Sequence, residues 1–273
     1  MPPPIKTKQV VPGNVASAAV LAVPTPKFVP PRMIINGVEG IGKTTIAAHA
    51  PGCAILMAKG ETGYLTLLGS GLVPERPAAT IDSWEQMTAT LDGLLMDDQG
   101  VKVLVLDALG GFERLCHEFT CRTAFGGDWG EQGFMAFHRG YALAVNDWID
   151  MLARLDALHK KGMAILLLSH TIIKEFKNPS GSNFDRYMTA CHEKTWDVTH
   201  KWSDIVLFNT FLIDAAKVDG KVKGKGGTQR MIYTQRTDTY DAKNRYGMPP
   251  VLTLTENPQE SWSIISKAIK GER

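Results

Sequence analysis

The chain reads Gly37-Val38-Glu39-Gly40-Ile41-Gly42-Lys43-Thr44 at the point that decides its fold. This stretch has the form GxxxxGK[ST], follows the apolar run Met33–Ile35, and leads through Thr45 into the helix-forming residues Ile46–Ala48. A strand, a loop and a helix in this order are what the motif requires. Its glycines allow backbone N–H groups and the positive end of the helix dipole to face a phosphate group. We therefore predict that residues Gly37 to Thr45 bind the phosphates of a nucleotide.

Two side chains of this loop and one carboxylate downstream are predicted to complete the nucleotide site. Lys43 is expected to reach the β- and γ-phosphates, and the Thr44 hydroxyl to bind Mg²⁺. The apolar run Val103–Leu106 ends at Asp107, the form of a strand that brings a Mg²⁺-binding acid to the phosphate loop. These residues predict ATP and Mg²⁺ as cofactors, with Thr44 and Asp107 as the metal ligands.

Two further polar residues follow apolar runs and are predicted to lie at the same edge of a sheet. Glu61 comes just after Ala54–Ala58 and is predicted to orient or deprotonate the attacking water; the alternative is a solvated glutamate in a turn. His170 ends the run Ala164–Ser169 and is predicted to hydrogen-bond the γ-phosphate, with a structural histidine as the alternative. Both are candidate catalytic residues.

Short apolar runs alternate with amphipathic stretches from Arg32 onward, which indicates βαβ units around a mostly parallel sheet. Strands are predicted at Met33–Asn36, Ala54–Ala58, Val103–Leu106, Ala164–Ser169, Ile205–Ile213, Arg230–Arg236 and Val251–Thr255. Helices are predicted at Thr44–Ala50, Ser83–Leu95 and Leu143–Lys160. The predicted fold is an α/β P-loop NTPase core, a mostly parallel sheet flanked by helices, with a C-terminal β-hairpin extension whose loop is the Lys/Gly-rich Lys217–Gly227.

The first 31 residues differ in composition from the rest. Residues 1–32 hold eight of the 15 prolines and no acidic residue. Because proline fixes φ and donates no backbone hydrogen bond, residues 1–31 are predicted to form a flexible arm and residues 32–273 a single ATPase-type domain. The arm is either a linker or a segment that docks on a neighbouring subunit or another partner.

The overall composition is that of a globular protein, with 44% hydrophobic and 21% charged residues and a net charge of +2. The longest apolar runs fall far short of the ~20 residues that span a bilayer, so no membrane partner is predicted. Four cysteines do not form a disulfide framework, and Cys116, His117 and Cys121 lack the usual spacing of a zinc site. We expect a soluble, cytoplasmic protein with reduced thiols.

Two other classes of P-loop protein match the sequence less well. The residues Asp107-Ala108-Leu109-Gly110 satisfy the DxxG pattern of GTPases, but Ala216 stands where the guanine-specific motif needs Asn or Thr. A small nucleotide kinase shares the phosphate loop but usually carries an arginine-rich lid, and no such segment is evident. Both classes are therefore less favoured than an ATPase.

Taken together, these motifs resemble the RecA/Rad51-like core ATPases, and most closely the short phage-encoded ATPases that act as single-strand annealing recombinases. The resemblance spans about Pro31 to Trp262 and would make the fold a RecA-like core. It rests on Gly37–Thr45, Glu61–Gly63, Val103–Asp107, Leu168–His170, Phe176–Gly181 and Asp241–Arg245.

The resemblance implies ATP hydrolysis coupled to binding of single-stranded DNA, in rings or filaments with ATP at the interfaces between subunits. It further implies a Lys-x-Arg pair, here Lys243 and Arg245, that reaches a neighbour's nucleotide; a solvated turn is the alternative. The DNA-facing loops would follow Asp107 and His170. A single-strand binding protein would be a further partner, and a phage-encoded protein would act in the cytoplasm of its bacterial host.

The residues themselves offer some support for DNA. Basic side chains at Lys217, Lys221, Lys223, Lys225 and Arg230 face a single acid, Asp219, and aromatic residues occur near Phe125–Phe134 and Phe176–Trp202. Basic residues with aromatic neighbours are typical of a groove for a single strand. The competing hypothesis is an ATP-dependent switch or assembly factor whose partner is a protein. An ATPase assay with and without single-stranded DNA separates the two.

Overall fold

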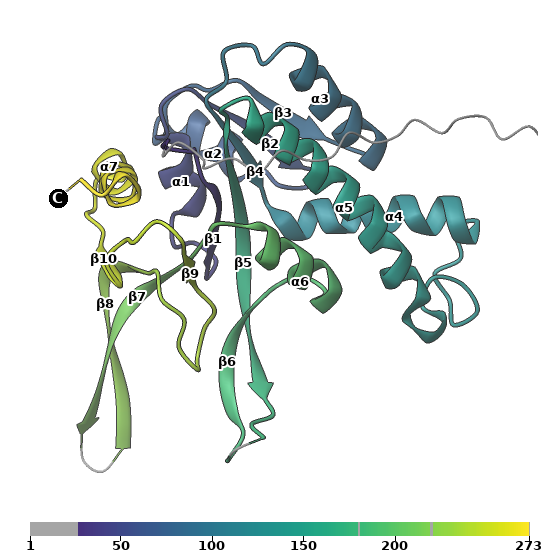
Figure 1. The fold of residues 1–273 in the computed structure, drawn as a ribbon. Helices are drawn as coiled ribbons and strands as arrows, with labels where there is room; N and C mark the ends of the chain where they lie inside the picture. Colours follow the sequence, from purple (N-terminus) through teal and green to yellow (C-terminus); the bar gives the residue numbers. More distant parts are fainter. Residues whose placement is uncertain (1–26, 180, 219–220, 273) are drawn as a thin grey trace, which may run out of the picture.

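The computed structural model describes residues 27–179, 181–218 and 221–272, and for residues 213–218 and 221–226 it describes the backbone alone. A ten-stranded sheet forms its centre, in the order β10-β8-β7-β1-β5-β4-β2-β3, with β6 paired to β5 and β9 to β7 (Figure 1). The strands are β1 (Arg32–Gly37), β2 (Cys53–Ala58), β3 (Ala78–Ile81), β4 (Val103–Asp107), β5 (Ala164–Phe176), β6 (Phe184–Thr189), β7 (Ile205–Val218), β8 (Lys221–Tyr233), β9 (Lys243–Asn244) and β10 (Val251–Thr253).

Helices cover both faces of this sheet. They are α1 (Lys43–Ala48), α2 (Gly63–Gly69), α3 (Trp84–Met96), α4 (Leu109–Phe125), α5 (Arg139–Lys160), α6 (Glu193–Trp202) and α7 (Pro258–Lys270), with a 3₁₀ turn at Ala136–His138 before α5. Apolar residues of α3, α4 and α5 form one core with the sheet, and those of α1, α2 and α7 form another on the opposite face.

The strands β3, β2, β4, β5, β1 and β7 run parallel, and each central strand is buried on both faces. In β1, Ile34 enters the core with α3–α5, whereas Met33 and Ile35 enter the core with α1 and α7. Burial on both faces explains why these strands read as continuous apolar runs in the sequence. The predicted α/β fold, a RecA-like P-loop NTPase core with a C-terminal β-hairpin extension, is confirmed.

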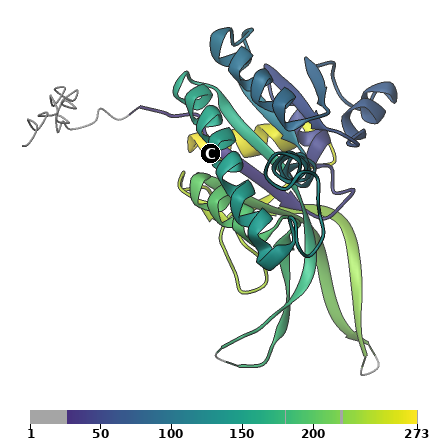
Figure 2. The ribbon, with the colours of Figure 1, turned by 90° about the vertical axis from the view of Figure 1, so that its right-hand side faces the viewer.

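Two strands are much longer than predicted. In the sheet Gly37, the last residue of β1, lies opposite His170 of β5 and Asn209 of β7. Beyond that level β5 continues for six residues and β7 for nine, which is about 20 Å and about 30 Å of chain. Each strand turns back on an antiparallel partner, β5 on β6 and β7 on β8. Figures 1 and 2 show both hairpins projecting from the same edge of the sheet.

The prediction of a loop at Lys217–Gly227 is therefore wrong for most of that segment. Lys217 and Val218 belong to β7 and residues 221–227 to β8, paired in register from Val218↔Lys221 to Ile213↔Gly226. Pairing with the opposite strand satisfies the backbone groups of a segment whose composition carries no strand signal. We name the hairpin of β5 and β6 the first arm, and the hairpin of β7 and β8 the second arm.

The predicted N-terminal arm lies mainly outside the described residues, which begin at Lys27. The residues just before β1 pack on the core: Phe28 meets the ring of Tyr246 edge-on, the Tyr246 hydroxyl donates to the carbonyl of Val29, and His159 Nε2 donates to that of Pro30. The division at residues 31 and 32 stays a prediction. Within the described part of the chain, no helix has the length and apolar character needed to cross a membrane.

Candidate active site

The phosphate loop connects the buried strand β1 to helix α1 at the carboxyl edge of the sheet. The loop reaches α1 through Gly42. Its φ of 93° lies in the left-handed region, which is unfavourable for residues that have a Cβ. Helix α1 then begins at Lys43 and packs Ile46, Ala47 and Ala48 into the core beneath the sheet. A buried strand and a packed helix thus hold the two ends of the loop in place.

The ammonium group of Lys43 lies at the centre of this loop. Its Nζ donates to the carbonyls of Gly37 and Val38, both at 2.9 Å, and lies 3.3 Å from Nδ1 of His170. The residue is only 5% exposed, and burial lowers the pKa of Lys43 to about 8, against the opposing charges of Asp107, Glu39 and Glu61. A cation so poorly solvated gains greatly from an anionic ligand.

The affinity for ATP is expected to fall as the pH rises above about 8. Phosphate binds the ammonium form of Lys43, and the pKa of this group in the free protein is about 8. Each further pH unit then removes about a factor of ten from the affinity, until the higher pKa of the bound state is passed. Calorimetric titrations between about pH 7 and about pH 10 measure this slope. A constant affinity over the range would contradict a contact between Lys43 and phosphate.

The predicted metal ligands Thr44 and Asp107 are brought into direct contact. The Thr44 hydroxyl donates to Oδ2 of Asp107 at 2.7 Å, across 63 residues of sequence. Asp107 ends β4 and is buried; burial raises the pKa of its carboxyl, whereas the hydrogen bond from Thr44 and the charges of His170 and Lys43 lower it. A hydroxyl and a carboxylate oxygen side by side are the hard ligands that Mg²⁺ prefers, so these residues fit that ion.

Glu61 lies at the same edge of the sheet, just after β2, the strand that pairs with β4. A tight turn, in which the Glu61 amide donates to the carbonyl of Ala58, follows the strand. Burial and the charge of Asp107 raise the pKa of the Glu61 carboxyl, while Arg114 and Lys43 lower it. A carboxyl with a raised pKa is a better proton acceptor than an ordinary one.

Helix α4 can approach Glu61 because its third residue is a glycine. A Cβ on Gly111 would lie 2.5 Å from Cβ of Ala58, which is closer than such atoms approach, and 3.7 Å from Oε1 of Glu61. Gly111 thus lets the start of α4 close over the end of β2. No sequence motif singled out Gly111, although the pair Gly110-Gly111 directly after Asp107 is a visible signal.

His170 is brought to the phosphate loop by the register of β5 with β1. It lies opposite Gly37, and its Nδ1 faces the Lys43 ammonium. Burial, together with the charge of Lys43, lowers the pKa of His170, so the neutral imidazole is favoured. A neutral ring that accepts from Lys43 at Nδ1 carries its proton on Nε2, where it is able to donate.

These five side chains form one constellation: they come from the phosphate loop, from the ends of β2 and β4, and from the middle of β5, where His170 lies level with the end of β1. A family model described as AAA domain (AAA_24) matches residues 29–246, which is most of the chain and contains all of them. The chain belongs to the AAA domain family. A comparison with curated proteins found no match.

The family assignment shows a P-loop ATPase domain, with nucleotide binding as its property. It does not separate RecA/Rad51-like proteins or annealing recombinases from other members, so that part of the predicted resemblance stays a prediction. In this AAA domain Gly37 to Thr45 carry the motif of a phosphate loop. Their binding of phosphate, and the metal and catalytic roles of Lys43, Thr44, Asp107, Glu61 and His170, stay predictions.

Lys243 and Arg245 are not brought to this constellation. Strand β9 pairs with the start of β7, Val206 with Lys243 and Ile205 with Asn244, at the amino ends of the parallel strands. The nucleotide loop is at the other end of β1. A role for this pair in the nucleotide site of its own subunit is therefore excluded by position.

The ammonium group of Lys243 caps the carboxyl end of helix α6. It donates to the carbonyls of His200 at 2.7 Å, Lys201 at 3.2 Å and Ser203 at 2.6 Å. Carbonyls at the end of a helix lack partners within the helix, and a cation there also opposes the negative end of its dipole. Arg245 differs, because it bonds Asp204 at 3.0 Å while its side chain stays 53% exposed. Of the predicted pair, Arg245 alone presents a largely exposed cation to a neighbouring subunit.

Replacing Lys243 with methionine is expected to lower the free energy of unfolding by about 1–3 kcal/mol, because carbonyls at the end of α6 lose a charged donor. ATP affinity and turnover per folded subunit should not change. Urea denaturation measures the first quantity, with Lys267→Met, an exposed lysine on α7, as the matched control. Unchanged stability combined with lost turnover would instead favour a catalytic role for Lys243 in a neighbour's site.

Several aromatic residues proposed for stacking on bases are structural. Helix α4 begins two residues after Asp107, so no loop follows that strand, and the predicted loop lies at the far end of the helix. There Phe134 is fully buried between Phe125, Trp129 and Tyr141. The stretch after His170 does form an exposed element, the first arm, with Phe176 and Phe184 in contact across it.

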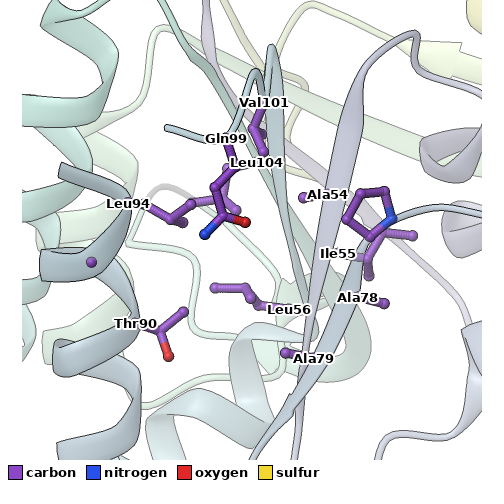
Figure 3. A pocket seen from close by; sticks show the side chains of 12 residues that line it. Ala54, Ile55, Leu56, Ala78, Ala79, Thr90, Leu94, Gln99, Val101 and Leu104 are labelled. Atoms are coloured by element: carbon purple, nitrogen blue, oxygen red, sulfur yellow. The ribbon is translucent and has the colours of Figure 1, made fainter. Parts of the chain in front are cut away.

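A separate apolar cavity of about 350 Å³ lies between α3 and the sheet, toward the amino ends of β2, β3 and β4 (Figure 3). Its lining is mostly small and aliphatic, including Ala54, Ala78, Ala79, Leu94 and Leu104. It offers no cluster of cations for phosphate and lies at the sheet end opposite Lys43. This cavity is therefore not part of the nucleotide site.

Proposed function

We propose that the protein is a Mg²⁺-dependent ATPase that acts on single-stranded DNA in phage-type recombination or replication, by annealing or loading strands. The observation that carries the ATPase is the constellation at the carboxyl edge of the sheet. Lys43, the contact of Thr44 with Asp107 at 2.7 Å, Glu61 and His170 come from four segments of the sequence and meet at the phosphate loop.

In this proposal each side chain has a defined task. The loop amides and Lys43 bind the phosphates, and Thr44 and Asp107 hold Mg²⁺, which neutralises charge that develops on the phosphates. Glu61 accepts the proton of the water that attacks the γ-phosphorus, as the bond to the ADP oxygen breaks. His170 donates from Nε2 to a γ-phosphate oxygen and thus registers whether that phosphate is attached.

The two arms support the DNA part of the proposal. They continue β5 and β7, the two neighbours of β1, past the phosphate loop on both sides (Figures 1 and 2). The first arm exposes Lys174 and Lys177, and the second has Lys221, Lys223 and Lys225 at alternate positions of β8. Basic residues on paired strands beside a nucleotide site suit a backbone-tracking contact with a single strand. We further propose a ring or filament in which Arg245 faces a neighbour's nucleotide.

The test is ATP hydrolysis and DNA binding with and without the lysines of the second arm. Binding of single strands should weaken with salt, with a log–log slope of about −0.7 for each phosphate contacted. Replacing Lys221, Lys223 and Lys225 with alanine should flatten that slope by about two units and abolish stimulation of ATPase by DNA. The matched control replaces the exposed Lys102, Lys267 and Lys270, which changes net charge equally. Equal slopes for both variants would exclude the second arm as the DNA contact.

A protein partner is the second candidate, favoured by three exposed apolar side chains in one short segment of the chain. Trp129, Met135 and Phe137, between α4 and α5, are 43%, 53% and 96% exposed. Apolar side chains grouped on a surface are typical of contacts between proteins. ATP hydrolysis that does not respond to single-stranded DNA, but depends on these three residues for a cellular function, would favour this candidate.

A further inference from the structure

Arg230, which the sequence places among the basic residues of the second arm, lies at the phosphate loop. Its Nη1 is 2.8 Å from the position that a Cβ on Gly42 would occupy. Gly42 is the residue directly before Lys43, in the part of the loop that faces the phosphates. The guanidinium group of β8 is thus in contact distance of the nucleotide loop of its own chain.

The strand register explains how β8 brings this side chain to the loop. Ile232 lies opposite Asn209, and Arg230 opposite Phe211. Ile232 belongs to the core formed with α1 and α7, and side chains two residues apart share a face of a strand. Arg230 therefore projects on the same face of the sheet as α1 and the phosphate loop.

Within the described residues, the hydrogen bonds of this guanidinium go to main-chain acceptors. Its Nη2 donates to the carbonyl of Thr255 at 2.8 Å and to that of Glu256 at 3.3 Å. Among the residues whose side chains the structure describes, no carboxylate forms an ion pair with Arg230. Its charge is therefore not neutralised by a described acid, while one edge of the group, Nη1, faces the loop.

A second polar group beside the loop has no described partner. Asn209 is fully buried opposite Gly37, and neither atom of its side-chain amide has a hydrogen-bond partner within the described residues. It lies on the same face of the sheet as Arg230, because Leu207, two residues before it on β7, belongs to the same core with α1 as Ile232 of β8. Buried amides without partners are costly and therefore rare. This flank of the loop thus presents a polar group where an apolar side chain would pack more favourably.

We propose that Arg230 is a second cationic ligand of the nucleotide, supplied in cis by the base of the second arm, and that its guanidinium binds the phosphate chain on the Gly42 side. This proposal rests on the proposed nucleotide-binding function of the loop. Lys43 and His170 then contact the phosphates from one flank and Arg230 from the other. Because Arg230 belongs to β8, a bound nucleotide ties the base of the second arm to the phosphate loop.

The test compares Arg230→Met and Arg230→Lys with the wild type, with ADP and inorganic tripolyphosphate as ligands in calorimetric titrations. A hydrogen-bonded guanidinium lost from a phosphate should weaken both ligands on the order of ten- to a hundredfold in Arg230→Met. Arg230→Lys should lose less, because it keeps the charge. The control is Arg154→Met, which removes a guanidinium that pairs with Asp92 between α5 and α3. Denaturation without ligand reports folding; if Arg230→Met does not fold, Arg230→Lys decides.

Each result of these titrations leads to a different conclusion. Unchanged affinity for both ligands would overturn the proposal and leave Arg230 as a tie between β8 and residues 255–256. Weaker ADP binding with unchanged tripolyphosphate binding would overturn the assignment to phosphate and place the guanidinium on the sugar or the base. A wild type that binds neither ligand would contradict the proposed nucleotide function itself. Slower hydrogen exchange of β8 amides with ADP in the wild type, but not in Arg230→Met, would support the link to the second arm.

Discussion

Replacing Lys43 with alanine is expected to abolish ATP hydrolysis while leaving the fold intact. The ammonium occupies the centre of the phosphate loop, 2.9 Å from two loop carbonyls, so its removal takes away the main positive charge that faces the β- and γ-phosphates. Loss of one such preorganised donor costs on the order of 10²–10³-fold in turnover. A coupled assay for phosphate release and calorimetric titration with ATP measure the two effects.

The stability of this variant provides its control. Burial lowers the pKa of Lys43 to about 8, which means that the folded protein disfavours the charged form of this side chain. Denaturation without nucleotide should therefore show that Lys43→Ala still folds, because removing the buried charge offsets the loss of its two hydrogen bonds. The stabilisation that ATP confers on the wild type should disappear in this variant. The exposed Lys270→Ala is the matched substitution and should behave as the wild type. Turnover close to that of the wild type in Lys43→Ala would exclude the predicted phosphate site.

Replacing Glu61 with glutamine is expected to separate binding from hydrolysis. The amide has the shape of the carboxylate and still positions water, but it cannot accept a proton, so turnover should fall by roughly 10²-fold or more. ATP affinity should be kept or slightly increased, because one negative charge near the phosphates is removed. Single-turnover kinetics and calorimetry with Mg²⁺ measure both quantities.

The control for this variant is Glu75→Gln, an exposed glutamate outside the site. It should change neither affinity nor turnover. If Glu61→Gln hydrolyses ATP at the wild-type rate, then Glu61 is a turn residue and another group accepts the proton. If ATP affinity is lost together with turnover, Glu61 supports the architecture of the loop instead of the chemical step.

Much of the nucleotide site was predictable because its signals are local. A strand buried on both faces needs an apolar run, and a phosphate loop needs glycines where φ is positive, as at Gly42. The apolar run that ends at Asp107 and the position of Glu61 directly after another such run follow from the same reasoning. In parallel strands these ends necessarily meet at one edge, which is why Thr44 and Asp107 are in contact.

Helix α7 was not predicted, although its boundaries carry local sequence signals. Helix α7 has Asn257 as its capping residue, Pro258 at its first position and Gly271 at its end, which is a complete set of helix boundaries. Helix α4 could not be predicted for a different reason. Gly110 and Gly111 are poor helix formers. At Gly111 the close approach to β2 explains the glycine, and this approach is visible only in the tertiary structure.

The sequence by itself determined the phosphate loop, its Mg²⁺-binding candidates and the class of the fold, because each depends on residues within a few positions of one another. The tertiary structure alone decided where the long-range cations lie. Lys243 caps the carboxyl end of α6, whereas the Arg230 side chain extends from β8 to Gly42. Neither contact can be predicted from the composition of the surrounding sequence. Their positions depend on strand register, which is set by pairing between segments far apart in the chain.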